Sequence, residues 1–145
     1  MITHSPDGTR YEWQHYRIGG KYSTSTAIIT MLKVDPIHPA ADDRGNTFEL
    51  VDRNSPAYRQ RGTRPQIGMY PSLLEAQEAA MSRIPWRLDL PGKNRWMRGN
   101  MAIVCRVIKG SRLWTWCVDG ELVLEHTDGA VLQVLADQYF AGIHG

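Results

Sequence analysis

Asp119-Gly120 stands between two β-rich runs, 113–118 and 121–126, and no other feature of the sequence constrains the fold as strongly. An Asp-Gly pair favours a two-residue turn in which both backbone φ angles are positive, and such a turn joins antiparallel strands. We therefore predict a hairpin at this point. The run 101–108 extends it to a third strand through a three-residue loop at 109–111.

Two helices are predicted from their end signals. Ser72 and Glu75 have the spacing of a capping box, so we expect a helix over 72–83 that ends before a proline. A second helix is expected over 130–140, with Asp128 as its N-cap and Gly142 as its stop. Further β-rich runs predict strands at the positions 11–18, 27–34, 47–51 and 66–70.

This order of elements indicates an α+β fold, in which antiparallel sheet is covered on one face by two helices. The 145 residues suit a single compact domain, 1–145. Strands followed by a helix occur twice, which suggests two strand-strand-helix halves, 1–85 and 99–145. The segment 86–98 contains Pro91 and Gly92 and is interpreted as an Arg/Trp-rich linker between these halves.

Charge is unevenly distributed along the chain, although the formal net charge is only +2. Residues 1–52 contain five Lys or Arg and seven Asp or Glu, whereas residues 53–112 contain twelve and three. Residues 113–145 contain five Asp or Glu and no Lys or Arg. The basic middle segment can attract phosphates or an acidic protein surface. Alternatively, it is neutralised within the fold by the acidic ends.

The hairpin register separates the side chains of its strands onto two faces. With a two-residue turn, Val118 faces Glu121, Trp116 faces Val123 and Trp114 faces Glu125. With a three-residue loop at 109–111, the strand at 101–108 adds Val104 and Arg106 to this tryptophan face. Either the first half of the chain covers these tryptophans, or a partner or a stacked base does.

The opposite face of the hairpin is mostly aliphatic, and we expect it to pack against the last helix. Its hairpin residues are Leu113, Thr115, Cys117, Leu122, Leu124 and His126, and the facing helix stripe is Val131, Leu132, Leu135 and Tyr139. The predicted third strand adds Cys105 to this face. We therefore predict that Cys105 and Cys117 are reduced, buried and not bonded to each other.

Arginine and tryptophan alternate within 86–98, and an arginine-rich loop lies at 52–65. Guanidiniums bind phosphates and indoles stack on bases, so these segments are the best signal for nucleic acid. Alternatively, Trp86 and Trp96 anchor the linker and the arginines only keep it soluble. The candidate binding residues are Arg53, Arg59, Arg61, Arg64, Arg87, Arg95, Trp96, Arg98, Arg106, Trp114 and Trp116.

No spacing of histidine, cysteine or carboxylate residues predicts a catalytic, metal or cofactor site. We therefore expect a non-enzymatic binding or regulatory protein that engages nucleic acid or a nucleoprotein complex. Inhibitors encoded by phages and other mobile elements, such as anti-CRISPR proteins, share this general character. The alternatives are a protein–protein interaction module or homodimer, and a small enzyme with an unrecognised site.

The sequence also predicts where the protein acts. Its start, 1–8, lacks the basic and apolar regions of a signal peptide, and no apolar run approaches the length of a membrane span. We expect a cytoplasmic protein that does not engage a membrane.

Overall fold

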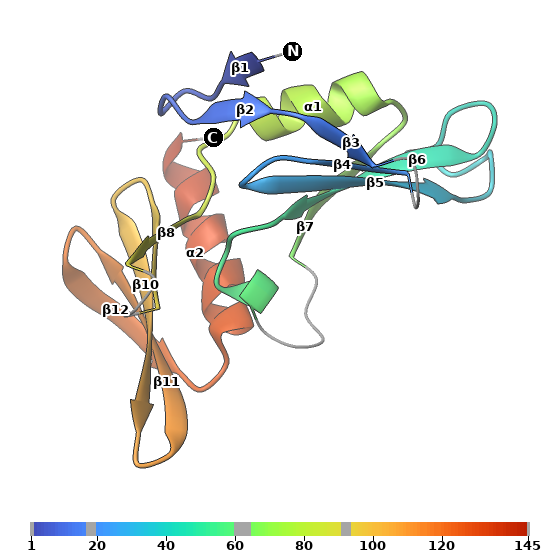
Figure 1. Cartoon of the computed structure of the whole chain (residues 1–145). Coiled ribbons are helices and arrows are strands. Elements are labelled where there is room, and N and C mark those ends of the chain that lie inside the picture. The colour runs from blue at the N-terminus through green and yellow to red at the C-terminus, as the bar shows by residue number, and fades with distance from the viewer. Residues whose placement is uncertain (1, 17–19, 60–64, 91–93, 145) are drawn as a thin grey trace. The chain divides into compact units, whose positions relative to one another are not determined.

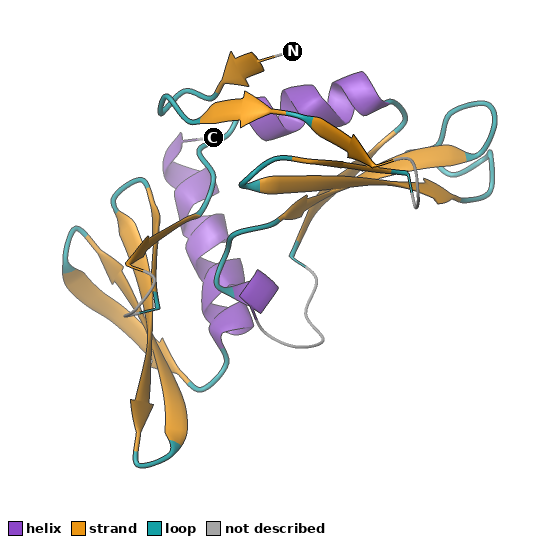
Figure 2. Ribbon diagram, viewed as in Figure 1, coloured by secondary structure: helices purple, strands orange, loops and turns teal. Residues whose placement is uncertain are grey.

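The structure is a computed structural model in which the described residues form two α-helices and two five-stranded antiparallel sheets, an α+β fold as predicted (Figure 2). It describes residues 2–16, 20–59, 65–90 and 94–144. The chain divides into two compact units. The first unit comprises Met1–Arg53 and Pro65–Pro85, and the second comprises Asn54–Arg64 and Trp86–Gly145.

The first unit contains a sheet whose strands follow one another in chain order (Figure 1). These strands are β3 (Gln14–Tyr16), β4 (Lys21–Ser23), β5 (Ala27–Lys33), β6 (Asn46–Asp52) and β7 (Gln66–Tyr70). A separate pair precedes them, β1 (Ile2–His4) with β2 (Arg10–Glu12). Helix α1 (Leu73–Met81) follows and packs against β5, β6 and β7.

Helix α1 begins as the sequence predicts. Ser72 is its N-cap, and the Ser72 hydroxyl oxygen accepts a hydrogen bond from the Glu75 backbone N–H at 3.1 Å. The Ser72 hydroxyl also donates to the Glu75 carboxylate at 2.9 Å, so the two side chains of the predicted capping box contact each other at the start of the helix. Two small residues, Ala76 and Ala80, are buried on the side of α1 that faces the core.

The core of the first unit lies between α1 and one face of the sheet. Its buried members are Tyr11, Ala27, Ile29, Leu50, Ala76 and Ala80. The Tyr11 hydroxyl donates to the Ala80 carbonyl at 3.2 Å, which ties β2 to the end of α1. Burial raises the pKa of the Tyr11 phenol, because the phenolate would lose its hydration.

The second unit repeats this order of five antiparallel strands followed by a helix. A short helix, η1 (Ala57–Arg59), also belongs to it. Its sheet comprises β8 (Arg87–Leu90), β9 (Arg95–Arg98), β10 (Met101–Ile108), β11 (Ser111–Val118) and β12 (Glu121–His126). The expected linker at 86–98 is therefore wrong, since this segment supplies two strands of the sheet.

Two turns of the same type connect the three longest strands of this unit. At both Lys109-Gly110 and Asp119-Gly120, the first residue has φ 52° and the glycine has φ 81°. Positive φ at both positions is the turn that fits strand twist, and glycine adopts it at little cost. The predicted hairpin at Asp119-Gly120 is confirmed, and Val118 faces Glu121 as expected. A bulge between Trp116 and Cys117 shifts the rest of the predicted register, so Trp116 pairs with Leu124 instead of Val123 and Trp114 pairs with His126 instead of Glu125. The preceding loop has two residues between its strands instead of three.

Helix α2 (Gly129–His144) packs against β10, β11 and β12. Asp128 caps it as predicted, because its carboxylate accepts from the Ala130 N–H at 2.9 Å. The helix continues past Gly142, so the predicted stop at that glycine is wrong. Its first residue must be small, since a Cβ at Gly129 would lie 2.5 Å from the Trp114 side chain.

Candidate functional site

Trp114 and Trp116 lie on the buried face of the second sheet, with exposed fractions of 2% and 6%. Cys105 pairs with Trp114 and Ile103 pairs with Trp116, so these residues share the tryptophan face. Val104 and Arg106, which we expected there, lie on the other face. The cause is the two-residue turn at Lys109-Gly110, because a shift of one residue moves every side chain of a strand to the opposite face.

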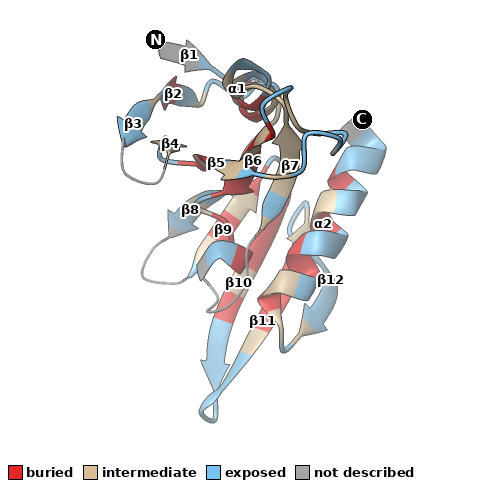
Figure 3. Ribbon diagram, turned by 90° about the vertical axis from the view of Figure 1, so that its right-hand side faces the viewer, coloured by how far each residue is buried: buried red, intermediate tan, exposed pale blue. Residues whose placement is uncertain are grey.

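Helix α2 covers this tryptophan face (Figure 3). The Trp116 ring meets the Tyr139 ring edge-on at 5.7 Å, and Trp114 stacks on Trp96 at 5.6 Å. The tryptophans are therefore covered by α2, within the second unit itself. The hairpin residues that we expected under the helix are divided between the two faces. Leu124 and His126 pair with Trp116 and Trp114 and share their face, whereas Leu113, Thr115, Cys117 and Leu122 lie on the opposite face.

Arg98 and Trp86 are also internal, although the sequence suggested a binding surface. The Arg98 guanidinium donates to Asp137 at 2.8 Å and lies 4.2 Å from the centre of the Phe140 ring. The Trp86 indole N–H donates to the same Asp137 oxygen at 2.9 Å. Trp96 is likewise buried. Four candidate residues are thus inaccessible in the folded chain: Trp96, Arg98, Trp114 and Trp116.

Three other candidates come together on the opposite face of the second sheet, which we call the outer face. Arg95 pairs with Val104, Arg106 pairs with Leu113, and Arg87 pairs with Met97. Alternation along the strands places all three arginines away from the tryptophans. A hollow of about 590 Å³ lies on this face, and its lining includes Arg95, Met97, Ala102, Val104, Arg106 and Cys117.

The outer face combines a cationic rim with an apolar floor. Arg87 and Arg106 are exposed, and no ion pair of either is found among the residues that the structure describes. Arg95 lies 3.6 Å from Asp89, but both side chains are partly exposed. Such surface pairs contribute no more than about 1 kcal/mol, so a phosphate can replace the carboxylate.

Both cysteines are free thiols, as predicted, but they do not share a face. Cys105 pairs with Trp114 and is buried, whereas Cys117 pairs with Ala102 on the outer face and is only partly buried. Both residues border the outer-face hollow. Burial raises the pKa of the Cys105 thiol, despite the opposing charge of Arg112. The shared aliphatic face and full burial of Cys117 were therefore wrong expectations.

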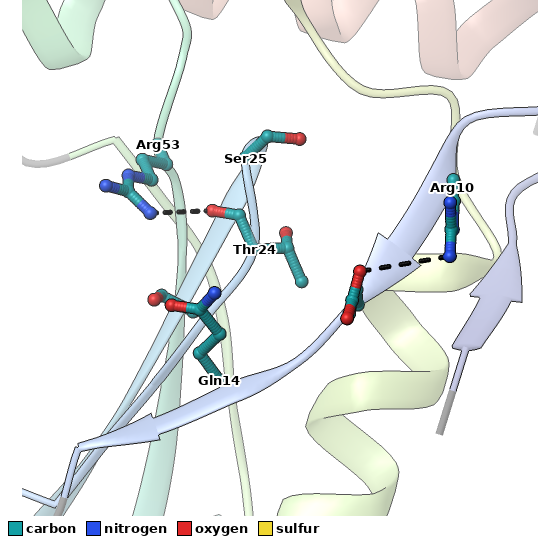
Figure 4. A pocket seen from close by; sticks show the side chains of 7 residues that line it. Arg10, Gln14, Thr24, Ser25 and Arg53 are labelled. Atoms are coloured by element: carbon teal, nitrogen blue, oxygen red, sulfur yellow. Dashed lines mark hydrogen bonds and ion pairs between the residues drawn. The ribbon is translucent and has the colours of Figure 1, made fainter.

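Arg53 belongs to the first unit, whereas the outer face belongs to the second. Its guanidinium donates to the Thr24 carbonyl at 2.8 Å (Figure 4). A hollow of about 290 Å³ at this point, which we call the Arg53 pocket, is lined by Arg10, Glu12, Gln14, Ser23, Thr24, Ser25 and Arg53. The sequence signal that could have indicated it is the run of four hydroxyl residues at 23–26.

The remaining candidates belong to the arginine-rich loop. Arg59 is the last residue of η1, and Arg61 and Arg64 lie outside the described residues. Within the ranges that the structure describes, no group of three His, Cys, Asp or Glu side chains is arranged to hold a metal ion. No described helix is both long and apolar enough to cross a membrane.

An exposed apolar surface on β12 and α2 was not expected. Of the predicted helix stripe, Leu132 is buried and Tyr139 contacts Trp116 while it stays partly exposed, whereas Val131 and Leu135 are exposed. Ala136 and Phe140 are buried in their place. Helix α2 is apolar on most sides, so its sequence alone did not indicate which side is covered. The exposed residues are Leu122, Val123, Leu124, Val131, Val134, Leu135, Tyr139 and Ile143.

Comparison with known proteins does not assign the chain to a family. No protein-family model, curated protein or solved structure matches it significantly.

Proposed function

We propose that this chain is a non-enzymatic binding protein whose outer face on the second sheet binds nucleic acid, free or within a nucleoprotein complex. The observation that carries the proposal is the placement of Arg87, Arg95 and Arg106 on one sheet face beside an apolar hollow. The concentration of twelve Lys and Arg residues in 53–112 supports the same conclusion. Small regulatory proteins of this kind include inhibitors encoded by mobile elements.

The chemistry of this face differs from the one that the sequence suggested. Tryptophan stacking is not available, because Trp96, Trp114 and Trp116 are buried. The arginines can instead bind phosphates through paired N–H donors and stack their planar guanidiniums on bases. The apolar side chains of Met97 and Val104 offer a floor for a base. An open sheet surface of this type suits single strands, whose bases are free to turn toward it.

The test is fluorescence anisotropy with single-stranded and duplex oligonucleotides at several salt concentrations. The variant is Arg87→Gln, Arg95→Gln and Arg106→Gln combined. A matched control removes three exposed cations of the first unit by the combined changes Lys21→Gln, Lys33→Gln and Arg44→Gln. Removing one arginine–phosphate interaction should lower the salt slope by about 0.7 for a single strand. The outer-face variant should therefore bind much more weakly, with a slope lower by about 2 units, while the control keeps the wild-type affinity and slope.

If the two triple variants lose oligonucleotide affinity equally, binding depends on net charge and not on the arginines of the outer face. No binding by the wild-type chain at low salt would reject the nucleic-acid proposal altogether. Thermal unfolding of all three proteins completes the comparison, since exposed arginine substitutions usually change stability by no more than about 0.5 kcal/mol.

The exposed apolar surface on β12 and α2 favours a second candidate, a protein–protein interaction module. Large apolar side chains exposed on two neighbouring elements favour protein contacts, and the charged residues in 113–145 are all acidic. A basic partner or a second copy of the chain can cover it. Analytical ultracentrifugation tests the second copy: a mass near twice 16.5 kDa that Val134→Asp returns to the monomer value supports a dimer through α2.

A further inference from the structure

The Arg53 pocket has a lining unlike the rest of the surface, because every one of its seven side chains is polar. Arg10, Glu12 and Gln14 come from β2 and β3, whereas β4 and the turn that follows it supply Ser23, Thr24 and Ser25. Arg53 follows β6 directly. Figure 4 shows Arg53, Thr24 and Gln14 close together, with Arg10 to one side.

Arg53 is held in place before any ligand arrives. Its backbone N–H donates to the Thr26 carbonyl at 3.1 Å, and its guanidinium donates to the Thr24 carbonyl at 2.8 Å. The turn that provides both carbonyls is itself braced, since the Thr24 hydroxyl oxygen accepts from the N–H groups of Thr26 and Ala27. A guanidinium fixed in this way loses less conformational freedom when it binds a ligand.

The charge of Arg53 is available to a ligand. Among the residues that the structure describes, no carboxylate lies within ion-pair distance of Arg53, whereas Arg10 and Glu12 lie 3.9 Å apart and offset each other. A guanidinium carries five N–H donors, and one carbonyl bond leaves others free. The hydroxyls of Ser23 and Ser25 and the Gln14 amide add neutral donors beside it.

We propose that the Arg53 pocket binds the phosphoryl group of a small polar molecule, with Arg53 as the main ligand and Ser25 and Gln14 as hydrogen-bond donors. One positive charge in excess, a planar fork of N–H donors and nearby hydroxyls match the tetrahedral oxygens of phosphate. The volume of about 290 Å³ leaves room for a polar group attached to that phosphate. This site is independent of the outer face, because all seven lining residues belong to the first unit.

The experiment is an amide NMR titration of the full chain with inorganic phosphate, ribose 5-phosphate, ribose and acetate, at constant ionic strength. Saturable shifts at the 23–26 turn and at Arg53 are expected with the two phosphates. Ribose alone should produce none, and acetate should bind at least about tenfold more weakly, because it lacks the third oxygen of a phosphoryl group. Equal binding of acetate and phosphate would contradict the phosphoryl assignment.

Variants separate a ligand role of Arg53 from a purely structural one. Arg53→Gln should weaken phosphate binding by about tenfold or more, since it removes a charge-assisted contact. Ser25→Ala, which leaves the braced turn intact, should weaken it several-fold. Arg44→Gln removes an exposed arginine outside the pocket and should change nothing.

Two further results would overturn the proposal. One is the absence of saturable shifts below about 10 mM phosphate, which corresponds to an affinity too weak for a formed site. The other is wild-type affinity in both Arg53→Gln and Ser25→Ala. If Arg53→Gln does not fold, Arg53→Lys replaces it, because lysine keeps the charge but loses the planar fork. Undiminished binding by Arg53→Lys together with Ser25→Ala would then reject the site.

Discussion

The Arg98 guanidinium lies 2.8 Å from Asp137, and the two side chains join β9 to α2 in the core of the second unit. Arg98 is 8% exposed, and its positive charge is balanced by this carboxylate and by the face of the Phe140 ring. Removing one member of a buried ion pair leaves the other charge without compensation, and this costs more than the pair contributes.

Asp137→Asn should therefore lower the free energy of unfolding by about 2–4 kcal/mol, measured by urea denaturation. The loss of stability should lie toward the lower end of this range, because the Asp137 side chain is 31% exposed to solvent. Glu121→Gln, at an exposed position of β12, is the control and should change stability by less than about 0.5 kcal/mol. If the two substitutions have equal effects, Arg98 is not held by Asp137.

Gly129 and Gly142 lie in the same helix but should respond in opposite ways to alanine. A Cβ at Gly129 would lie 2.5 Å from the Trp114 ring, whereas a Cβ at Gly142 has no heavy atom within 4 Å. Gly129→Ala should destabilise the chain by about 1–3 kcal/mol through overpacking. Gly142→Ala should stabilise it by up to about 1 kcal/mol, since alanine favours helix. Thermal unfolding of both variants tests whether α2 seats directly on Trp114, and stabilisation by Gly129→Ala would refute that contact.

The sequence predicted those elements whose signals are local. The capping box of Ser72 and Glu75 placed the start of α1, and Asp119-Gly120 placed the hairpin of β11 and β12. The face of each strand was not predictable in the same way. For β10 it depended on whether the loop after this strand has two residues or three, and Lys109-Gly110 gave a weaker signal than Asp119-Gly120. For β12 it depended on the bulge between Trp116 and Cys117.

The prediction of the candidate site was partly wrong for the same reason, because the sequence did not indicate on which face of the sheet each strand residue lies. The strands β8 and β9 have four residues each, too few to show alternation, and the nearby proline and glycines suggested a linker. Arg98 and Trp96 were consequently expected at the surface, although pairing with β10 turns them inward. Arg87, Arg95 and Arg106 remained accessible because they occupy the alternate positions of the same sheet.

The two cysteines should differ in reactivity toward a thiol reagent. Cys105 is buried and its pKa is raised, so its thiolate is both scarce and covered at neutral pH. Cys117 is half-buried on the uncovered face. Cys117 should therefore react at least about tenfold faster, and Cys105 should react only after unfolding. Single variants, Cys105→Ala and Cys117→Ala, identify the signals, and rapid labelling of Cys117→Ala would show that α2 does not protect the tryptophan face.

The stability of the chain should fall in alkaline solution, partly because of Tyr11. The folded-state pKa of this phenol is raised by burial above its ordinary value of 10.0. Above that value the unfolded state releases the proton while the folded state retains it, so the unfolded state binds fewer protons and stability falls as pH rises.

Tyr11→Phe removes this titration. Urea unfolding between about pH 8 and 11 should show a shallower decline for Tyr11→Phe than for the wild type, after an initial decrease of about 1 kcal/mol for the hydrogen bond to the Ala80 carbonyl. Parallel slopes for wild type and Tyr11→Phe would show that Tyr11 is ionisable in the folded chain and is not sealed between β2 and α1.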